Sequence, residues 1–256
     1  MEPESGLSAI RAWFESPLGR QVVNVQQAVL EQLLPGFFGY HLMQLSIQSA
    51  PLYGPSPIHH KFSMALRPDD DAAFLGKATS LPFADDSMDV TILHHLLDFY
   101  DSPQQILREV ARVTIPSGHV VIAGFNPLSL WGLCKPVGRI RGNAPWIGSF
   151  IRPGRLMDWL NLLNFKIDRA HYCTYGLPVN RKPFVGRVPD YTQGISRKSS
   201  LPFGAVYVIV ARKQVGTMTS IRPVWRQSKA FSRLTVVRPA AGRSVSRNTS
   251  TPDASD

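Results

Sequence analysis

The sequence predicts an α/β protein with a doubly wound, mostly parallel sheet, preceded by N-terminal helices and followed by a disordered C-terminal tail. Two observations support this fold class. Strand-like segments alternate with amphipathic helical segments from residue 40 to residue 173, and this alternation places helices on the faces of a parallel sheet. Residues 88–93 and 119–125 are nearly continuous runs of apolar and β-branched side chains, as expected for strands that are buried on both faces.

The composition is that of a globular protein, with 44% hydrophobic and 18% charged residues. No apolar run approaches the roughly 20 residues that would span a bilayer, so we expect no transmembrane segment. The acidic start at residues 1–5 does not resemble a signal peptide. The two cysteines, Cys134 and Cys173, have neither a metal-site nor a C-x-x-C spacing. We therefore expect a cytoplasmic protein with reduced thiols.

Residues 1–35 are predicted to form a helical lead-in. Apolar side chains recur at helical spacing from Leu7 to Phe14, and Pro17 and Gly19 interrupt this pattern. A second helix is predicted from about residue 20 to residue 34, before a Pro-Gly pair that ends it.

The remaining elements follow from periodicity and from proline and glycine punctuation. A helix is expected to begin at Pro103, which suits a first helical position. The last strand follows a long connection without an evident helix, so we expect it to insert antiparallel at the edge of the sheet. The expected strands cover residues 40–45, 61–66, 88–93, 119–125, 165–173 and 205–211, with helices from residue 103 and over residues 153–164.

Two motifs identify a family. Residues 81–99 read LPFADDSMDVTILHHLLDF, which resembles the LPF-x-D-x-S-F-D-V-V signature of the type-11 class I S-adenosylmethionine-dependent methyltransferases. Residues 107–122 read LREVARVTIPSGHVVI, which resembles the L-R-E-x-x-R-V-L-x-P-G-G motif of that family. The motifs occur in the family's order and spacing. The resemblance implies a methyltransferase-like domain over residues 1–213.

The resemblance also implies a cofactor, S-adenosylmethionine, which would lie across the carboxyl ends of the strands. His94 would lie near the methyl group and is the candidate catalytic residue, acting as a base. Lys77 would flank the adenine, at a position where the family often has an acid. The residues implied to bind the cofactor are Gln44, Ser46, Gln48, Ala78, Thr79, Leu81 and His94.

The cofactor-binding half of the domain departs from the family pattern. The family has D-x-G-x-G-x-G after the first strand, whereas residues 44–50 read QLSIQSA. Ser46, Gln48 and Ala50 thus replace glycines, and Gln44 replaces the acid. Two functions remain open: a divergent methyltransferase with an unidentified acceptor, or a catalytically inactive methyltransferase-like domain used for binding or regulation.

Other polar groups are given structural roles. Glu109 and Arg112 are expected to form ion pairs that hold the fold. His94 and His95 both follow a strand, and either could act as a base; the alternative is that one packs beneath the sheet and the other caps it. No metal site is expected, because the aspartates at residues 85–89 are typical of a solvated turn. Residues 128–149 mix tryptophans with basic side chains and are expected to form a lid or a substrate wall, with contact to a membrane surface or to a partner as the alternative.

The tail, residues 214–256, is basic and is expected to be mostly disordered because it has little apolar periodicity. About seven of the ten net positive charges lie at or after Arg212. Spaced arginines are compatible with nucleic-acid binding, but the scarcity of aromatic residues among them does not favour it.

Overall fold

The computed structural model describes residues 3–48, 50–65, 74–140, 142, 144–175 and 203–215. These residues belong to one compact unit, which spans Met1–Gly216. The tail predicted from residue 214 lies outside the described residues, except for Gln214 and Val215. The same is true of most of the long loop after residue 175. No described helix is both long enough and apolar enough to cross a membrane.

A seven-stranded sheet forms the centre of this unit, in the order β3-β2-β1-β4-β5-β7-β6. The first five strands in this order are parallel, and β7 is antiparallel to both of its neighbours. This confirms the predicted mostly parallel α/β sheet. The strands are β1 (His41–Ser46), β2 (His60–Ala65), β3 (Phe74–Leu75), β4 (Met88–His94), β5 (Thr114–Phe125), β6 (Phe165–Cys173) and β7 (Val206–Lys213).

The last strand is antiparallel, as expected, but the expectation that it lies at the edge is wrong. β7 pairs with β5 on one side and with β6 on the other, so β6 is the edge strand. The residue types explain this order. β7 is buried at every position from Val206 to Ala211, whereas β6 carries exposed polar side chains such as Lys166 and Arg169, which suit an edge.

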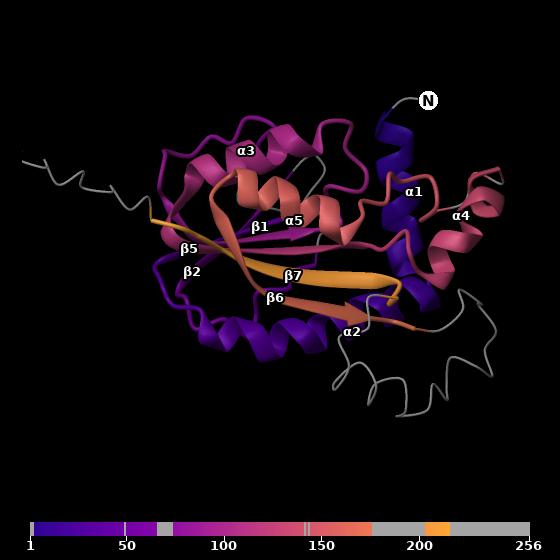
Figure 1. Cartoon of the computed structure of the whole chain (residues 1–256), viewed down its shortest axis with the longest axis horizontal. Coiled ribbons are helices and arrows are strands. Elements are labelled where there is room, and N and C mark those ends of the chain that lie inside the picture. The colour runs from indigo at the N-terminus through magenta and orange to yellow at the C-terminus, as the bar shows by residue number, and fades with distance from the viewer. Residues whose placement is uncertain are drawn as a thin grey trace, which may run out of the picture. The chain divides into compact units, whose positions relative to one another are not determined.

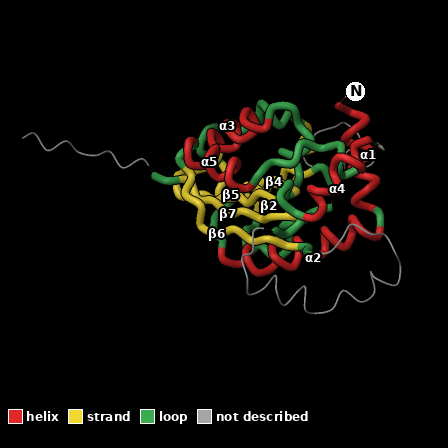
Figure 2. The backbone as a smooth tube through the Cα atoms, turned by 45° about the vertical axis from the view of Figure 1, so that its right-hand side comes forward, coloured by secondary structure: helices red, strands yellow, loops and turns green. Residues whose placement is uncertain are grey.

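Helices cover both faces of the sheet. Figures 1 and 2 show α3 and α5 on one face and α2 on the other. A short 3-10 turn, η1 (Leu34–Gly36), follows α2 and leads toward β1. The helices are α1 (Pro3–Glu15), α2 (Pro17–Leu33), α3 (Pro103–Val113), α4 (Leu130–Ile140) and α5 (Pro153–Leu162).

The junction between α1 and α2 corrects one expectation from the sequence. Pro17 begins α2, which therefore starts three residues earlier than predicted. Ser16 is its N-cap and accepts a hydrogen bond from the Gly19 amide at 3.1 Å. A Cβ atom on Gly19 would lie 2.1 Å from the carbonyl oxygen of Trp13. Glycine is required here because the two helices turn so closely on one another.

Candidate functional site

Ser46 and His94 meet where the direction of the chain across the sheet reverses. From β1 the chain adds β2 and β3 on one side, and from β4 it adds β5 on the other. Ser46 ends β1, His94 ends β4, and the two are register partners. Ser46 Oγ lies 3.1 Å from His94 Nδ1. Open α/β sheets bind their ligands at this kind of topological switch point, outside the carboxyl ends of the strands.

A glutamine from α2 joins His94 to the next residue along the chain. His94 Nε2 donates to Gln26 Oε1 at 3.0 Å, and Gln26 Nε2 donates to His95 Nε2 at 2.8 Å. All three side chains are fully buried. With the amide in this orientation, His94 carries its proton on Nε2 and His95 carries its proton on Nδ1. His94 Nδ1 is then the acceptor for the Ser46 hydroxyl.

The chain of hydrogen bonds ends on Asp98. His95 Nδ1 lies 3.2 Å from Asp98 Oδ2, which also accepts from the Phe125 amide at 2.9 Å. The His95 backbone has a φ of 54°, in the left-handed region that side chains rarely adopt. This backbone conformation turns the imidazole toward α2. Side chains from β1, β4 and α2 thus form one buried path from Ser46 to Asp98.

Burial keeps these groups neutral. It lowers the pKa of His95 to about 3. Burial, followed by the neighbouring His95, also lowers the pKa of His94 well below its usual value. Burial raises the pKa of Asp98 to about 8, although the Phe125 and Ile151 amides and the charge of Lys135 act in the opposite direction. Both imidazoles are therefore uncharged at neutral pH.

Aromatic rings enclose the histidine pair. Phe14 of α1 lies 5.6 Å from His94 and 5.2 Å from His95, between ring centroids, and Phe125 lies 4.2 Å from His95. Trp131 of α4 stacks on Phe125 at 6.3 Å. These apolar neighbours account for the burial that suppresses protonation of both imidazoles.

The loop after β1 corresponds to the glycine-rich loop of the family, and here the side chain of Gln44 holds it in place. Gln44 Nε2 donates to the Ala50 carbonyl at 3.0 Å, and Gln44 Oε1 accepts from the Leu52 amide at 2.8 Å. The Gln48 amide donates to Ser46 Oγ at 3.0 Å. Among the described residues, no group bonds the buried Oε1 atom of Gln48. Gln44 thus shapes the loop, and Gln48 retains an unused acceptor.

The remaining predicted cofactor residues lie on a separate turn after β3. Ala78 and Leu81 are buried, Thr79 is half-buried and Lys77 is exposed. The Leu81 amide donates to Glu109 Oε2 at 3.0 Å. Hydrogen bonds bring Ser46, Gln48 and His94 together. The turn at residues 77–81 is held separately from this group, by Glu109 of α3.

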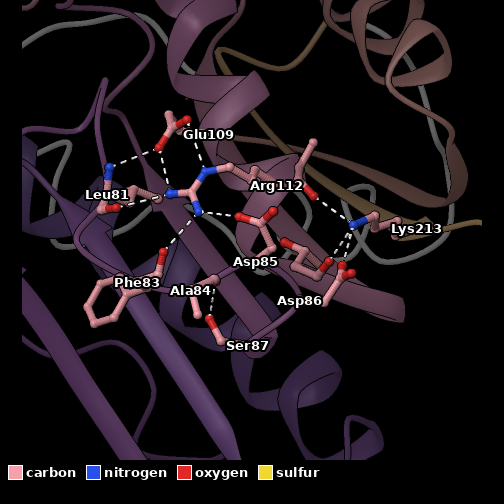
Figure 3. A network of polar contacts seen from close by, with 11 residues as sticks. Leu81, Phe83, Ala84, Asp85, Asp86, Ser87, Glu109, Arg112 and Lys213 are labelled. Carbon is pink, nitrogen blue, oxygen red and sulfur yellow. Dashed lines mark hydrogen bonds and ion pairs between the residues drawn. The ribbon is translucent and has the colours of Figure 1, made fainter.

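Arg112 fixes the same turn, as Figure 3 shows. Its guanidinium donates to the carbonyls of Leu81 and Phe83 at 3.0 and 2.9 Å and to the carboxylates of Glu109 and Asp85. Glu109, the first of these carboxylates, and Asp85 raise the pKa of Arg112, and Arg112 lowers the pKa of Glu109. The structural role predicted for Glu109 and Arg112 is confirmed.

Sequence reasoning pointed to both His94 and His95 but missed Gln26 and Asp98. The burial of Gln26 could have been predicted from helical spacing, since it lies on the apolar side of α2 with Val22 and Leu30. Asp98 gave no such signal, because an aspartate four residues after a strand resembles a solvated loop residue.

The described residues fit a cationic ligand that carries hydrogen-bond donors. Gln48 Oε1 is an unused acceptor next to the switch point. The imidazoles of His94 and His95 are neutral, so they do not repel a sulfonium. The aspartates at residues 69–71, which follow β2, lie outside the described residues.

Comparisons with known proteins identify relatives of this chain. A family model described as a methyltransferase domain matches residues 44–122. The uncharacterized protein YafS of Escherichia coli K12 is 32% identical over 235 residues, which cover 90% of each chain. A demethylmenaquinone methyltransferase of Renibacterium salmoninarum is 43% identical over 60 residues, or 23% of this chain and 25% of that protein.

Solved structures show the same fold. A SAM-dependent methyltransferase from Thermotoga maritima superposes with a TM-score of 0.60 at 17% identity and covers 79% of this chain and 93% of its own. The matched domain includes the β1 loop, the switch point and the motif-bearing β4–α3–β5 unit. This chain belongs to the type-11 family of class I methyltransferases, with S-adenosylmethionine as the cofactor.

Proposed function

We propose that this methyltransferase binds its cofactor across Ser46 and His94 and methylates an apolar, ring-containing acceptor whose nucleophilic atom needs no base from the described residues. The observation that carries the proposal is the pairing of Ser46 with His94 at the switch point, at 3.1 Å. When bound, S-adenosylmethionine supplies an electrophilic methyl group. The tasks of the protein are therefore to position the acceptor and to exclude water.

Each predicted cofactor residue has a proposed task. Gln48 Oε1 accepts from the ribose or from the amino group of the methionine part. Gln44 acts indirectly, because it holds the loop that carries Gln48. The adenine is assigned to the turn at residues 77–81, where Ala78 contributes a small apolar side chain. Thr79 and Leu81 flank that ring.

The proposed role of His94 is to border the methyl group as a neutral, oriented side chain. Gln26 occupies its Nε2 atom and Ser46 occupies its Nδ1 atom. His94 can accept a proton from an acceptor only if the Ser46 hydroxyl turns away from Nδ1. The lowered pKa of His94 also disfavours the protonated product of such a step. A nucleophile that is already deprotonated or uncharged avoids this cost.

An apolar ring in the acceptor suits the surface near the end of β5. The half-buried rings of Trp13, Phe99 and Trp146 gather around Phe125 and Trp131, with centroid separations of 5.8 to 6.5 Å. Aromatic rings bind other flat rings through offset and edge-to-face contacts. The partial relatives named demethylmenaquinone methyltransferases make a quinone the first acceptor to test.

We further propose that the protein works in the cytoplasm. Both Cys134 and Cys173 are free thiols, which suits a reducing compartment.

Calorimetric titration of the full chain with S-adenosylmethionine and S-adenosylhomocysteine tests the cofactor site. We expect both to bind with micromolar affinity. Methyl transfer is then followed with labelled cofactor and a reduced demethylated quinone in detergent. If a demonstrably folded chain bound neither cofactor form, the non-catalytic alternative would replace this proposal. Cofactor binding without transfer to any ring-containing acceptor would refute the acceptor class alone.

A further inference from the structure

Helix α4 presents a stripe of apolar side chains to solvent. We call Leu130, Leu133, Val137 and Ile140 the α4 stripe; their exposed fractions are 47%, 76%, 56% and 88%. At about 100° per residue, these four positions fall within an arc of about 80° on the helix. Leu128, just before the helix, is 53% exposed. Exposed apolar side chains that cluster in this way mark interaction surfaces more often than isolated ones do.

The opposite side of α4 holds the helix to the domain. Trp131 is 1% exposed, and its carbonyl accepts from Trp146 Nε1 at 3.1 Å. A Cβ atom on Gly138 would lie 2.5 Å from the Trp146 ring, so glycine permits this close packing. The α4 stripe therefore lies on the side of α4 that faces away from these packing contacts. Figure 1 shows α4 at the periphery, beside α1 and beyond the ends of the strands.

The segment around α4 is uniformly basic. Residues 128–157 contain no acidic side chain and five basic ones. Lys135 faces the domain, with its ammonium 4.5 Å from the centroid of the Phe150 ring, so the charge available to a partner comes from Arg139, Arg141, Arg152 and Arg155. The nearest acids in the sequence are Glu109 and Asp158. An apolar stripe on a basic segment is complementary to an anionic surface with an apolar interior.

We propose that the α4 stripe docks this protein on an anionic lipid bilayer, with α4 lying in the plane of the interface. Interfacial helices place apolar side chains below the head groups, while lysine and arginine contact the anionic lipids. α4 follows the carboxyl end of β5, so docking brings the edge of the switch-point site to the membrane. The inference rests on α4 and on the basic residues that follow it in the sequence, and it does not depend on the proposed acceptor.

The test is co-sedimentation of the full chain with vesicles. One set contains equal parts phosphatidylglycerol and phosphatidylcholine, and the other contains phosphatidylcholine only. We expect stronger binding to the anionic set and a weaker interaction at high salt. The double variant Leu133→Glu/Ile140→Glu should bind the anionic vesicles at least about tenfold less, because it removes two apolar side chains from the interface.

The matched control is Phe38→Glu/Leu162→Glu. Phe38 and Leu162 are 78% and 81% exposed and lie outside α4, so this variant has the same charge change on the same full chain, basic tail included. It should bind as the wild type does. Equal binding by both double variants would overturn the proposal and assign the attraction to charge alone. Absence of vesicle binding, with a dimer that the α4 variant dissociates, would overturn it in favour of self-association.

Discussion

Gln26 and His95 lie 69 positions apart in the sequence and are joined by a buried hydrogen bond of 2.8 Å. This bond and its counterpart from His94 to Gln26 fasten α2 over the carboxyl end of β4. Both imidazoles depend on a single amide side chain, which supplies one acceptor and one donor. The helical lead-in is therefore part of the site and does more than cover the sheet.

Replacement of Gln26 by leucine is predicted to destabilise the protein strongly. His94 Nε2 would lose its acceptor, and His95 Nε2 would lose its donor, in a fully buried environment. A buried polar group without a partner costs about 1–3 kcal/mol, so we expect a loss of about 2–4 kcal/mol in the free energy of unfolding. Urea denaturation followed by circular dichroism measures this.

Gln27 supplies the control, because it is the next residue of α2 and is exposed. Gln27→Leu should change the free energy of unfolding by no more than about 0.5 kcal/mol. Equal losses in the two variants would show that helix packing, and not the histidine contacts, determines the effect.

The raised pKa of the buried Asp98 predicts that the protein loses stability as the pH rises through neutrality toward 8. Its pKa is raised from 3.8 to about 8 by burial, so between these values the folded state holds a proton that the unfolded state has lost. Stability from this group is full at low pH and is lost as the pH rises toward 8. The lowered histidine pKa values act oppositely but only below about pH 6.5.

The window from pH 6.5 to 8 isolates Asp98 from the two histidines. Its contribution there approaches 1.4 kcal/mol per pH unit, so we expect a fall of up to about 2 kcal/mol in the wild type. Asp98→Asn cannot titrate and should remove this slope. Thermal unfolding at matched pH values measures the difference, and parallel curves for the two proteins would contradict the assignment.

The cofactor site makes a separate prediction at Gln48. Its Oε1 atom is buried and is not bonded by any described residue. Gln48→Ala should therefore leave the fold intact and weaken S-adenosylhomocysteine binding about tenfold, as expected for the loss of one hydrogen bond of about 1.4 kcal/mol. Calorimetric titration measures the affinity, with the exposed Gln27→Ala as a control. Unchanged affinity would place the ligand away from the β1 loop.

The positions of β4, α3 and the end of β5 could be predicted closely from the sequence, whereas β5 begins at Thr114, five residues earlier than expected. The expected strand at residues 88–93 and the helix from Pro103 agree with β4 and α3 to within a residue. Local signals were sufficient because buried β-branched runs, proline at a first helical position and an amphipathic stripe all act within one element.

Other parts depend on contacts that are distant in sequence. α4 was not predicted as a helix, because Gly132, Pro136 and Gly138 oppose helix formation. Its packing against Trp146 overrides that local preference. β3 has two residues and no periodicity. The order of β7 and β6 in the sheet could not be predicted from the sequence either. The two strands are separated by a long connection, and the more fully buried strand takes the inner position.

The contacts of Arg112 predict that the turn before β4 is stable only when a guanidinium group stands at this position. Its donors reach the carbonyls of Leu81 and Phe83 as well as the carboxylates of Asp85 and Glu109. A lysine keeps the charge but cannot fork across these acceptors. Arg112→Lys should therefore lower the free energy of unfolding by about 1–3 kcal/mol.

Arg108 lies one turn earlier on α3 and is exposed, so Arg108→Lys should leave stability unchanged within about 0.5 kcal/mol. A second readout distinguishes the turn from the helix. Hydrogen exchange at the Leu81 amide, which donates to Glu109, should accelerate in the Arg112 variant, because Glu109 loses the group that orients it. If exchange at Leu81 stayed protected while stability fell, the loss would belong to α3 itself, and the turn would be held by its buried Ala78 and Leu81 side chains.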